Sequence, residues 1–476
     1  MLSRRAFLAT LAASTTVPAL VRAQSAPRAS AADNPPTVLR LARRSIEVKG
    51  KPASVFGIRQ ADGTFGIRTA VGQRFRVRVE NAIDEPSLIH WHGLTPPWQQ
   101  DGVPGISGPP IPAGGSADYD FPLPFGGTFW MHSHYGLQEQ LMMSAPLIIR
   151  DQRDQADQQE VIVMLADFSF TPPEQIFANL RKPRAMPAMA GAKDGMKGMT
   201  MKDSAMGGGK PDLNDVTYDA FLANDRTLDD PEVVKVEPGG RVLLRIVNSS
   251  SMSAFHIDLG QLDGELIAVD GLRVAPVVAR RFPIAVAQRL DIRLAIPRAA
   301  AAHPVLEGDA RQTGIVLRAG DAPVDRIAND AAQPSGALTL ELESRLRAAA
   351  PLAQRKADRI HTINLTGEMA SYSWSINNVV WSKDTPPLPV AKGERVELIM
   401  INRTMMPHPM HLHGHAYQVV EIDGTRLAGA MRDTVLVPPG RRVVVAFDAD
   451  NPGHWAFHCH LLYHLEAGMF TTFRYV

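Results

Sequence analysis

The sequence has a single cysteine, Cys459, in 476 residues. One cysteine excludes a disulfide within the chain, so the thiol needs another explanation. Long apolar runs are also missing. Past the N-terminus no stretch is apolar and long enough to cross a bilayer, so we expect no stable membrane insertion. An excess of one charge is missing too. The formal net charge is +1, and Lys and Arg form no stripe, which argues against a nucleic-acid partner.

The N-terminus has the pattern of an export signal. Arg4 and Arg5 precede a moderately apolar run that ends near Leu20, and small residues for cleavage follow. This pattern predicts a twin-arginine signal peptide over residues 1–23 and hence a periplasmic protein that is exported already folded. The alternative is a disordered basic arm. The apolar run is too short for a permanent membrane helix.

Three segments resemble each other at a spacing of about 160 residues, which is the size of a domain. Each has a glycine turn, a strand of alternating apolar residues and then Asn; they are 69–82, 236–250 and 390–404. Such alternation predicts a half-buried strand in each segment. Helical patterns are scarce. The sequence therefore predicts an all-β chain of three tandem β-sandwich domains, each a small Greek-key barrel. We place them at 38–150, 161–318 and 359–476.

Most of the 15 histidines fall into short clusters at matching positions of the first and third repeats. The matching segments are HWHG (90–93) with HLHG (411–414), and GTFWMHSH (127–134) with GHWAFHCH (453–460). Ser133 then aligns with Cys459. The middle repeat has no paired histidine, so we interpret His256 as a structural residue and the middle domain as a spacer.

A His-x-His pair on a strand points both side chains to the same face. Four such pairs from two domains would supply eight imidazoles to one cavity between the domains. They are His90, His92, His132, His134, His411, His413, His458 and His460. A lone histidine is usually an ordinary core or surface residue, but four tandem pairs in matching positions indicate a metal site. Zinc is the poorer alternative, since eight imidazoles exceed its tetrahedral need.

A second cluster indicates copper as the metal. Two imidazoles, a thiolate and a weak axial thioether form the trigonal blue-copper site. The sequence offers this set in His408, Cys459, His464 and Met469. A bound metal would keep the thiol of Cys459 deprotonated, which explains the single cysteine.

The segments HWHG, HSH, HPMHLHGH (408–415) and HCHLLYHLEAGM (458–469) resemble the four copper-binding motifs of the multicopper oxidases. TFWMHSHYGLQEQL (128–141) and HCHLLYHLEAGM are most similar to bacterial copper-resistance oxidases. The resemblance implies three cupredoxin-like domains and four coppers per chain. It assigns type 1 copper to His408, Cys459, His464 and Met469, type 2 copper to His90 and His411, one type 3 copper to His92, His132 and His460, and the other to His134, His413 and His458.

The resemblance also implies how electrons and protons reach dioxygen. Cys459 lies between His458 and His460, so one tripeptide joins the blue site to the three-copper cluster. Asp101, nine residues after His92, stands where the family often has an acid near the type 2 copper. We predict a proton relay there; the alternative is an ordinary turn residue. Many relatives place a second acid directly after the last type 1 histidine, where this chain has Leu465, with Glu466 one residue later.

The reducing substrate is less well defined by the sequence. Residues 186–206 hold six methionines, and thioethers prefer Cu(I), so the segment favours copper recruitment over an incidental low-complexity insertion. Met405, Met406 and Met410 flank His408 as a substrate entrance or as packing.

We expect a monomeric oxidase that uses O2 and oxidises Cu(I) in copper tolerance. Alternatives are a laccase-type phenol oxidase and a non-catalytic envelope copper-binding or scaffold protein. The third repeat and the second set of histidine pairs disfavour a two-domain nitrite reductase.

Overall fold

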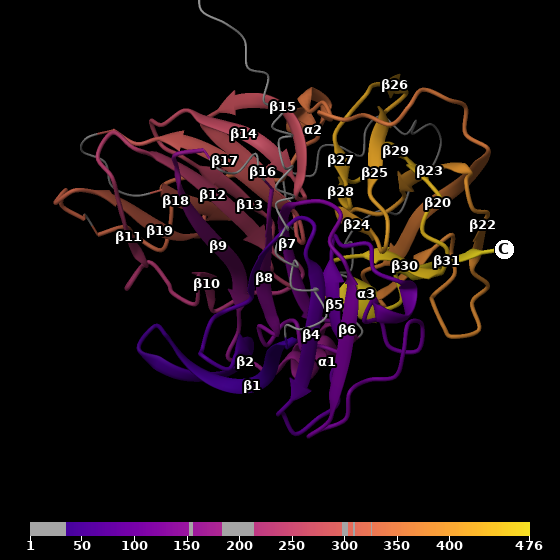
Figure 1. Cartoon of the computed structure of the whole chain (residues 1–476), viewed down its shortest axis with the longest axis horizontal. Helices are drawn as coiled ribbons and strands as arrows, with labels where there is room; N and C mark the ends of the chain where they lie inside the picture. Colours follow the sequence, from indigo (N-terminus) through magenta and orange to yellow (C-terminus); the bar gives the residue numbers. More distant parts are fainter. Residues whose placement is uncertain (1–34, 152–155, 183–213, 298–302, 308–309, 325) are drawn as a thin grey trace, which may run out of the picture. The chain divides into compact units, whose positions relative to one another are not determined.

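A computed structural model of the chain describes residues 35–151, 156–182, 214–297, 303–307, 310–324 and 326–476. The predicted signal peptide (1–23) and the methionine-rich segment (186–206) lie outside these residues. The part of the chain from Pro36 to Val476 forms one unit, and it is built from three sets of strands (Figure 1).

The first set of strands forms two four-stranded sheets, in the orders β2-β1-β4-β6 and β3-β8-β7-β5. Its elements are β1 (Thr37–Val48), β2 (Lys51–Gln60), β3 (Ile67–Ala70), β4 (Arg74–Asn81), β5 (Ile89–His92), the 3-10 turn η1 (Trp98–Gln100), β6 (Ser116–Pro122), β7 (Gly127–Ser133) and β8 (Ser144–Arg150). A single apolar core fills the space between the two sheets.

The second set forms sheets in the orders β10-β9-β12-β17-β14-β15 and β11-β19-β18-β13-β16. Its elements are β9 (Gln159–Phe168), α1 (Pro173–Leu180), β10 (Ala220–Ala223), β11 (Val233–Val236), β12 (Arg241–Asn248), β13 (Phe255–Asp258), β14 (Gly264–Val269), β15 (Leu272–Ala279), β16 (Arg281–Ile284), β17 (Arg289–Ala295), β18 (His303–Glu307) and β19 (Gln312–Ala319). Helix α2 (Glu341–Arg345) lies in the connection to the third set.

The third set forms sheets in the orders β21-β20-β23-β29-β25-β26, with β27 paired to β25, and β22-β31-β30-β24-β28. Its elements are β20 (Arg359–Glu368), β21 (Ser373–Ile376), β22 (Leu388–Val390), β23 (Arg395–Asn402), β24 (His408–Leu412), β25 (Tyr417–Ile422), β26 (Thr425–Arg426), β27 (Met431–Arg432), β28 (Thr434–Val437), β29 (Arg442–Asp448), β30 (His454–Cys459), α3 (Leu462–Glu466) and β31 (Phe470–Tyr475). The prediction of an all-β chain is confirmed.

The three sets repeat one topology. The pairs β1/β4, β9/β12 and β20/β23 are all parallel, as are β3/β8, β11/β19 and β22/β31. The strand pairs β5/β7, β13/β18 and β24/β30 therefore occupy equivalent positions, and all three are antiparallel. The first and third of these pairs carry the paired histidines. The second has single histidines, His256 on β13 and His303 on β18, but no His-x-His pair, as the sequence predicted.

The repeated asparagine has a structural role in each set. Asn81, Asn248 and Asn402 end β4, β12 and β23, and all three are buried. Each side-chain oxygen accepts the N–H two residues later, at 3.1, 3.2 and 2.8 Å. Each amide nitrogen donates to a carbonyl farther along. These hydrogen bonds fix the loop that leads to β5, β13 or β24.

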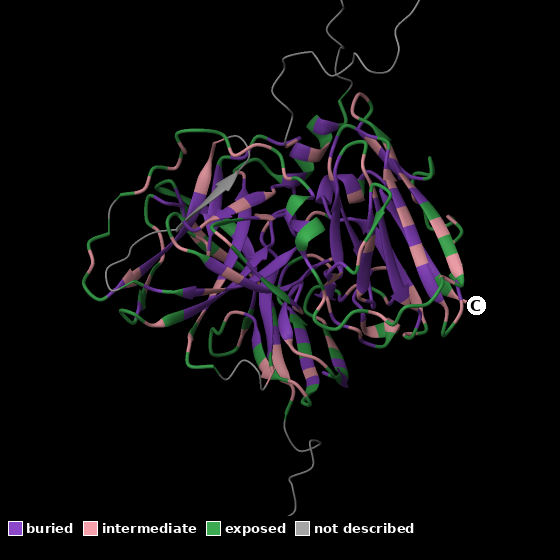
Figure 2. Cartoon of the chain, turned by 90° about the horizontal axis from the view of Figure 1, so that it is seen from above, coloured by how far each residue is buried: buried purple, intermediate pink, exposed green. Residues whose placement is uncertain are grey.

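The middle strand β12 differs from the prediction of a half-buried strand, because seven of its eight residues are buried. Its outer face packs against β7 of the first set. Figure 2 shows the same trend for the whole chain: buried residues fill the inner strands, and exposed residues lie on loops and outer edges.

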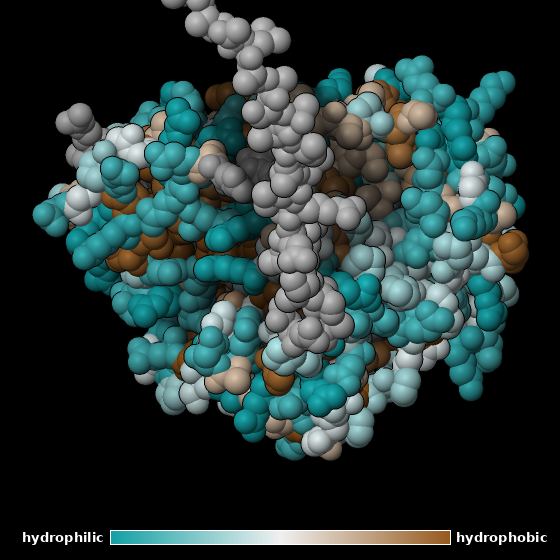
Figure 3. Space-filling model, in the orientation of Figure 1, coloured by the Kyte–Doolittle hydropathy of each residue, from teal (hydrophilic) through white to brown (hydrophobic). Residues whose placement is uncertain are grey.

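None of the helices in the described ranges is long and apolar enough to span a membrane. The face of the molecule in Figure 3 is mainly hydrophilic, and its apolar residues form only small areas.

Candidate metal centres

Eight histidines from the first and third sets of strands meet, as the sequence predicted. In each set the ligand-bearing strands are hydrogen-bonded neighbours. His90 on β5 lies opposite His132 on β7, and His411 on β24 lies opposite His458 on β30. The second histidine of each pair follows at the alternate position and faces the same side. All eight are buried except His134, which is partly exposed.

The ring nitrogens of these histidines approach each other closely. The nitrogen pairs are His90 Nε2 to His411 Nε2 at 3.4 Å, His92 Nδ1 to His132 Nε2 at 3.4 Å, His134 Nε2 to His458 Nε2 at 3.3 Å, and His413 Nε2 to His458 Nε2 at 2.9 Å. Two of these four pairs, His90 with His411 and His134 with His458, join the first domain to the third. The other two lie within one domain. The histidines therefore share one centre between the first and third domains.

The outward nitrogens show which nitrogen of each ring carries the proton. The Nδ1 atoms of His90, His411 and His458 donate to the backbone oxygens of Asp101, Asp433 and Cys459, at 2.8, 2.8 and 2.9 Å. His92 is reversed, because its Nε2 faces Asp433. In each ring the other nitrogen then presents a lone pair to the centre.

A bound cation fits this arrangement. Burial lowers the pKa of His92, His411 and His458 well below the ordinary value, and of His134 to about 3. The rings are therefore neutral, with lone pairs that repel one another. His460 Nε2 is buried with no hydrogen-bond partner in the described part of the chain. A group of inward imidazoles suits copper, so the residues present fit copper ions.

The second predicted cluster also assembles. His408, Cys459 and His464 are fully buried, and their ligand atoms form a triangle. Cys459 Sγ lies 3.5 Å from His408 Nδ1 and 3.9 Å from His464 Nδ1, and the two nitrogens are 3.2 Å apart. Burial raises the pKa of the Cys459 thiol well above its usual value. A thiolate at this place needs a metal ion, and the donor set of two imidazoles and one sulfur suits copper.

Met469 belongs to the same cluster by its backbone. Its N–H donates to the oxygen of His464 at 3.0 Å, and its oxygen accepts the N–H of Cys459 at 3.1 Å. The side chain is fully buried. Met469 is thus held beside both ligand residues, where an axial thioether is expected.

The outer nitrogens of the two histidines have buried polar partners. His408 Nε2 lies 2.7 Å from the hydroxyl of Thr404. His464 Nε2 lies 2.8 Å from Asp215 Oδ2, and the same oxygen accepts the hydroxyl of Tyr372 at 2.7 Å. Asp215 belongs to the middle domain.

Asp101 lies where it was predicted, between two ligand histidines. Its Oδ2 is 2.8 Å from His413 Nδ1, and its Oδ1 is 3.3 Å from His90 Nδ1. Asp101 follows the turn η1 and is fully buried. The carboxyl therefore contacts one predicted type 2 ligand and one predicted type 3 ligand.

A second buried carboxyl, Glu139, lies on the other side of the centre. Its Oε2 is 3.0 Å from His132 Nδ1, and its Oε1 is 3.8 Å from His460 Nδ1. Glu139 and Glu466 line one cavity of about 30 Å³ together with four of the histidines, enough for a water molecule. Leu465, which stands at the position where many relatives have an acid, lines the same cavity. Glu139 therefore provides a buried acid on that side of the centre.

The sequence did not identify three residues that contact ligands. Glu139 lies five residues after the HSH motif, and an acid so close to the motif was the available signal. Asp433 and Asp215 come from segments that carry no motif. The interpretation of the middle domain as a spacer was wrong: its Asp215 contacts the ligand residue His464, and its Arg289 pairs with Asp433, which contacts His92. His256 lies on β13 of the middle domain, and burial lowers its pKa to about 4.

Comparison with known proteins agrees with this geometry. Three models of the multicopper oxidase family match residues 42–154, 160–303 and 355–476. The chain is 32% identical to multicopper oxidase MmcO of Mycobacterium tuberculosis over 86% of this chain and 81% of that protein. It is 27% identical to copper resistance protein A of Pseudomonas syringae pv. tomato over 99% of each.

Solved structures share the fold. Fet3p, described as a multicopper oxidase that functions in iron import, superposes with a TM-score of 0.76 at 20% identity, over 92% of this chain and 90% of that one. A laccase from Botrytis aclada gives 0.74 at 21% identity, over 93% and 89%. With three matching domains, a relative above the 30% level and two histidine-lined centres, the chain belongs to the multicopper oxidase family.

Proposed function

We propose that this chain is a cuprous oxidase. It takes electrons from Cu(I) at a type 1 copper and reduces O2 to water at a three-copper cluster, and so contributes to copper tolerance. The observation that carries the proposal is the surroundings of His464. Phe177 and Asp215, on either side of the methionine-rich part of the chain, contact this ligand or the residue before it.

The N-terminal flank of the methionine-rich segment is helix α1. Phe177 of α1 stacks on Tyr463, the residue before His464, with ring centroids 6.0 Å apart. The C-terminal flank is Asp215, whose carboxylate contacts His464 Nε2 at 2.8 Å. The described residues on both sides of the segment therefore contact His464 or its neighbour Tyr463.

The methionines have a limited reach from that ligand. Met206 precedes Asp215 by nine residues, which span at most roughly 30 Å when fully extended. Met405 adds an exposed thioether at the same centre: it is 84% exposed, next to Thr404, which contacts His408. Met406 and Met410 are buried, and act as packing. Thioethers suit Cu(I), and relatives named copper resistance protein A support a copper substrate.

Four coppers are proposed, with the ligands that the resemblance implies. The close group His134, His413 and His458 corresponds to one type 3 set, and the group His408, Cys459 and His464 to the type 1 set. Bound copper would supply one-electron transfer and the binding and reduction of O2. The chain supplies the rest: His458-Cys459-His460 connects the two centres covalently, and the carboxyls of Asp101 and Glu139 lie beside His413 and His132, where they can pass protons. Dioxygen needs four protons as well as four electrons.

Deletion of residues 186–206 tests the substrate. We expect kcat/KM for Cu(I) to fall on the order of tenfold, as for the loss of ~1.4 kcal/mol of binding, while phenol oxidation stays unchanged. A variant with the six methionines replaced by Ser keeps the segment's length and controls for the deletion. Oxygen uptake with Cu(I) and with a phenol is the measurement. Preference for phenol in the intact and deleted proteins would indicate a laccase-type enzyme, and no uptake with either donor a copper-binding protein.

Replacing Met469 with Leu is expected to raise the reduction potential of the type 1 copper. Leu has a similar volume but no sulfur, so the weak axial donor that stabilises Cu(II) is lost. Redox titration of the blue absorption measures the shift. Met400 is equally buried, on β23, so M400L serves as the matched control. An unchanged or lower potential in M469L would remove Met469 from the ligand set.

The proposed place of action is the bacterial periplasm, reached through a twin-arginine signal over residues 1–23. Support comes from Arg4 and Arg5 before the apolar run. Replacing both with Lys tests it: the protein should then stay in the cytoplasm. Export of the double variant at the normal level would contradict a twin-arginine signal. We expect the exported enzyme to act as a monomer.

A further inference from the structure

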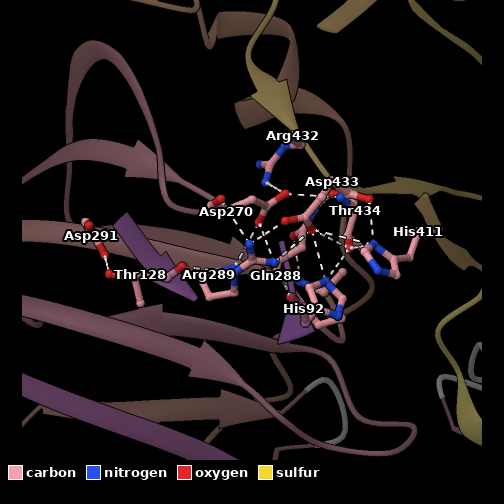
Figure 4. Close-up of polar contacts among 12 residues, drawn as sticks. His92, Thr128, Asp270, Gln288, Arg289, Asp291, His411, Arg432, Asp433 and Thr434 are labelled. Atoms are coloured by element: carbon pink, nitrogen blue, oxygen red, sulfur yellow. Dashed lines mark hydrogen bonds and ion pairs between the residues drawn. The ribbon is translucent and has the colours of Figure 1, made fainter. Parts of the chain in front are cut away.

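A buried arginine of the middle domain lies directly behind the oxygen-reducing centre (Figure 4). Arg289, at the start of β17, is 0% exposed. Its Nε donates to the oxygen of Thr128 at 3.1 Å, and Nη1 and Nη2 donate to the oxygens of Ala287 and Asp270 at 3.0 Å each. The two remaining N–H groups donate to Oδ1 and Oδ2 of Asp433, the first at 2.8 Å. All five donors of the guanidinium are used.

The partners of Arg289 come from all three domains. Thr128 is on β7 of the first, Ala287 and Asp270 belong to the second, and Asp433 precedes β28 of the third. A guanidinium with a bidentate carboxylate and three carbonyl acceptors has one geometry. Burial alone would lower the pKa of Arg289, but Asp433 and Asp270 outweigh it and hold the pKa above the ordinary value. The residue is a fixed positive charge.

Asp433 connects this charge to two copper-site histidines. Its Oδ1 accepts from His92 Nε2 at 3.0 Å, and its backbone oxygen accepts from His411 Nδ1 at 2.8 Å. The two imidazole rings stack with centroids 3.7 Å apart. The hydroxyl of Thr434 lies 3.2 Å from a nitrogen of each ring and donates to Asp433 at 2.9 Å. A shift of Asp433 would therefore move both rings.

The positive charge of Arg289 also affects how strongly the Asp433 carboxylate accepts the hydrogen bond from His92. A carboxylate that accepts an imidazole N–H pulls the proton and makes the ring a stronger donor to a metal. Arg289 draws on both oxygens of the same carboxylate and weakens that pull. In a buried site this effect is larger than in water. Arg289 thus moderates the donor strength of His92 toward a metal.

The glycine of the HWHG motif leaves room for the ion pair. Gly93 has φ +89°, and a Cβ there would lie 2.6 Å from Arg289 Nη2 and 2.7 Å from Asp433 Oδ2. No side chain fits at this position without displacing the pair. The HWHG motif therefore supplies the ligand residues His90 and His92, and its glycine leaves space for the Arg289–Asp433 pair that positions His92.

We propose that Arg289 is a positioning residue for oxygen reduction: through Asp433 it sets the orientation and donor strength of His92 and His411. The inference rests on the proposed function in taking these two histidines as copper ligands. It assigns to the middle domain, which bears no predicted ligand, a part in the three-copper cluster.

The test compares R289Q and R289K with R245Q in the full copper-loaded chain. Arg245 is the matched control, since it is a buried middle-domain arginine that donates to the hydroxyl of Thr128 at 3.0 Å and pairs with Asp291 at 2.9 Å. The carboxylate partners of Arg245 include Asp291 and Glu160, whereas that of Arg289 is Asp433. Copper content, the EPR signal of the copper at His90 and His411, and the blue absorption are measured.

In R289Q we expect a changed EPR signal for that copper and a loss of copper affinity of about 10- to 100-fold, because the lost orientation of the two rings outweighs their stronger donation. The stronger donation should lower the cluster potential. The blue absorption and R245Q should stay as in the unaltered chain. R289K keeps the positive charge but lacks the bidentate guanidinium, so we expect a smaller change. If R289Q does not fold, the result for R289K tests the proposal. An unchanged EPR signal and affinity in the folded variants, or an equal change in R245Q, would overturn the proposal. Loss of the signal in the unaltered chain would instead contradict the proposed function.

Discussion

Replacing Cys459 with Ser is expected to abolish the blue absorption and to reduce oxygen consumption to background. The proposed type 1 centre would have one thiolate sulfur ligand, and His408 and His464 alone do not provide the trigonal set. Serine has almost the same size and a hydroxyl that stays protonated. The Cys459 side chain lies on the opposite face of β30 from His458, because successive side chains alternate along a strand. The three-copper cluster should therefore keep its copper.

Copper analysis separates this outcome from misfolding. We expect C459S to bind one copper fewer than the unaltered chain and to keep the EPR signal of the copper at His90 and His411. Ser133 occupies the aligned position in the first domain, so S133A is a matched control with full activity expected. Retention of the blue absorption in C459S would remove Cys459 from the type 1 centre. Loss of every copper would show that the two centres do not form independently.

Replacing Asp101 with Asn is expected to lower oxygen turnover by about 10²- to 10⁴-fold, the range for loss of a positioned acid or base. The amide is isosteric and keeps one oxygen near His413 Nδ1, which is 2.8 Å from the carboxylate. It has no ionisable proton to pass. Reduction of the type 1 copper by the donor should be unaffected, since Asp101 does not contact His408 or His464.

Stopped-flow mixing measures the two steps separately: bleaching of the blue absorption by Cu(I) without oxygen, and its return on adding oxygen. Only the second should slow in D101N. Asp118 is an exposed acid of β6 paired with Arg78, so D118N provides a control in which both steps stay normal. Equal slowing of both steps in D101N would contradict a proton relay and favour a structural turn residue.

The histidine pairs were predictable because a β-strand alternates its side chains. His-x-His spacing fixes which face both rings take, and the repeat showed that the third domain presents the same pattern as the first. The position of Asp101 came from the family resemblance and not from spacing. Its contact with His413, at 2.8 Å, joins residues more than three hundred positions apart.

The contacts of Asp215, Asp433 and Arg289 could not be predicted in the same way. Each arises where two domains pack together, and no local pattern records which loop of one domain meets which ligand of another. The burial of Arg289 is an example, because a single arginine at the start of a strand is normally exposed. The full burial of strand β12 was missed for the same reason, because its outer face is covered by β7 of another domain.

Because each half of the histidine set belongs to a different domain, bound copper acts as a crosslink between domains that are distant in the chain. Ions that bind only the docked arrangement stabilise it by RT ln(1 + [L]/Kd). The cost of separating the first and third domains therefore depends on copper supply. Without copper, the interface between the first and third domains would open before either domain unfolds. The sensitivity of the interdomain connections to proteolysis would therefore report how much copper the protein holds.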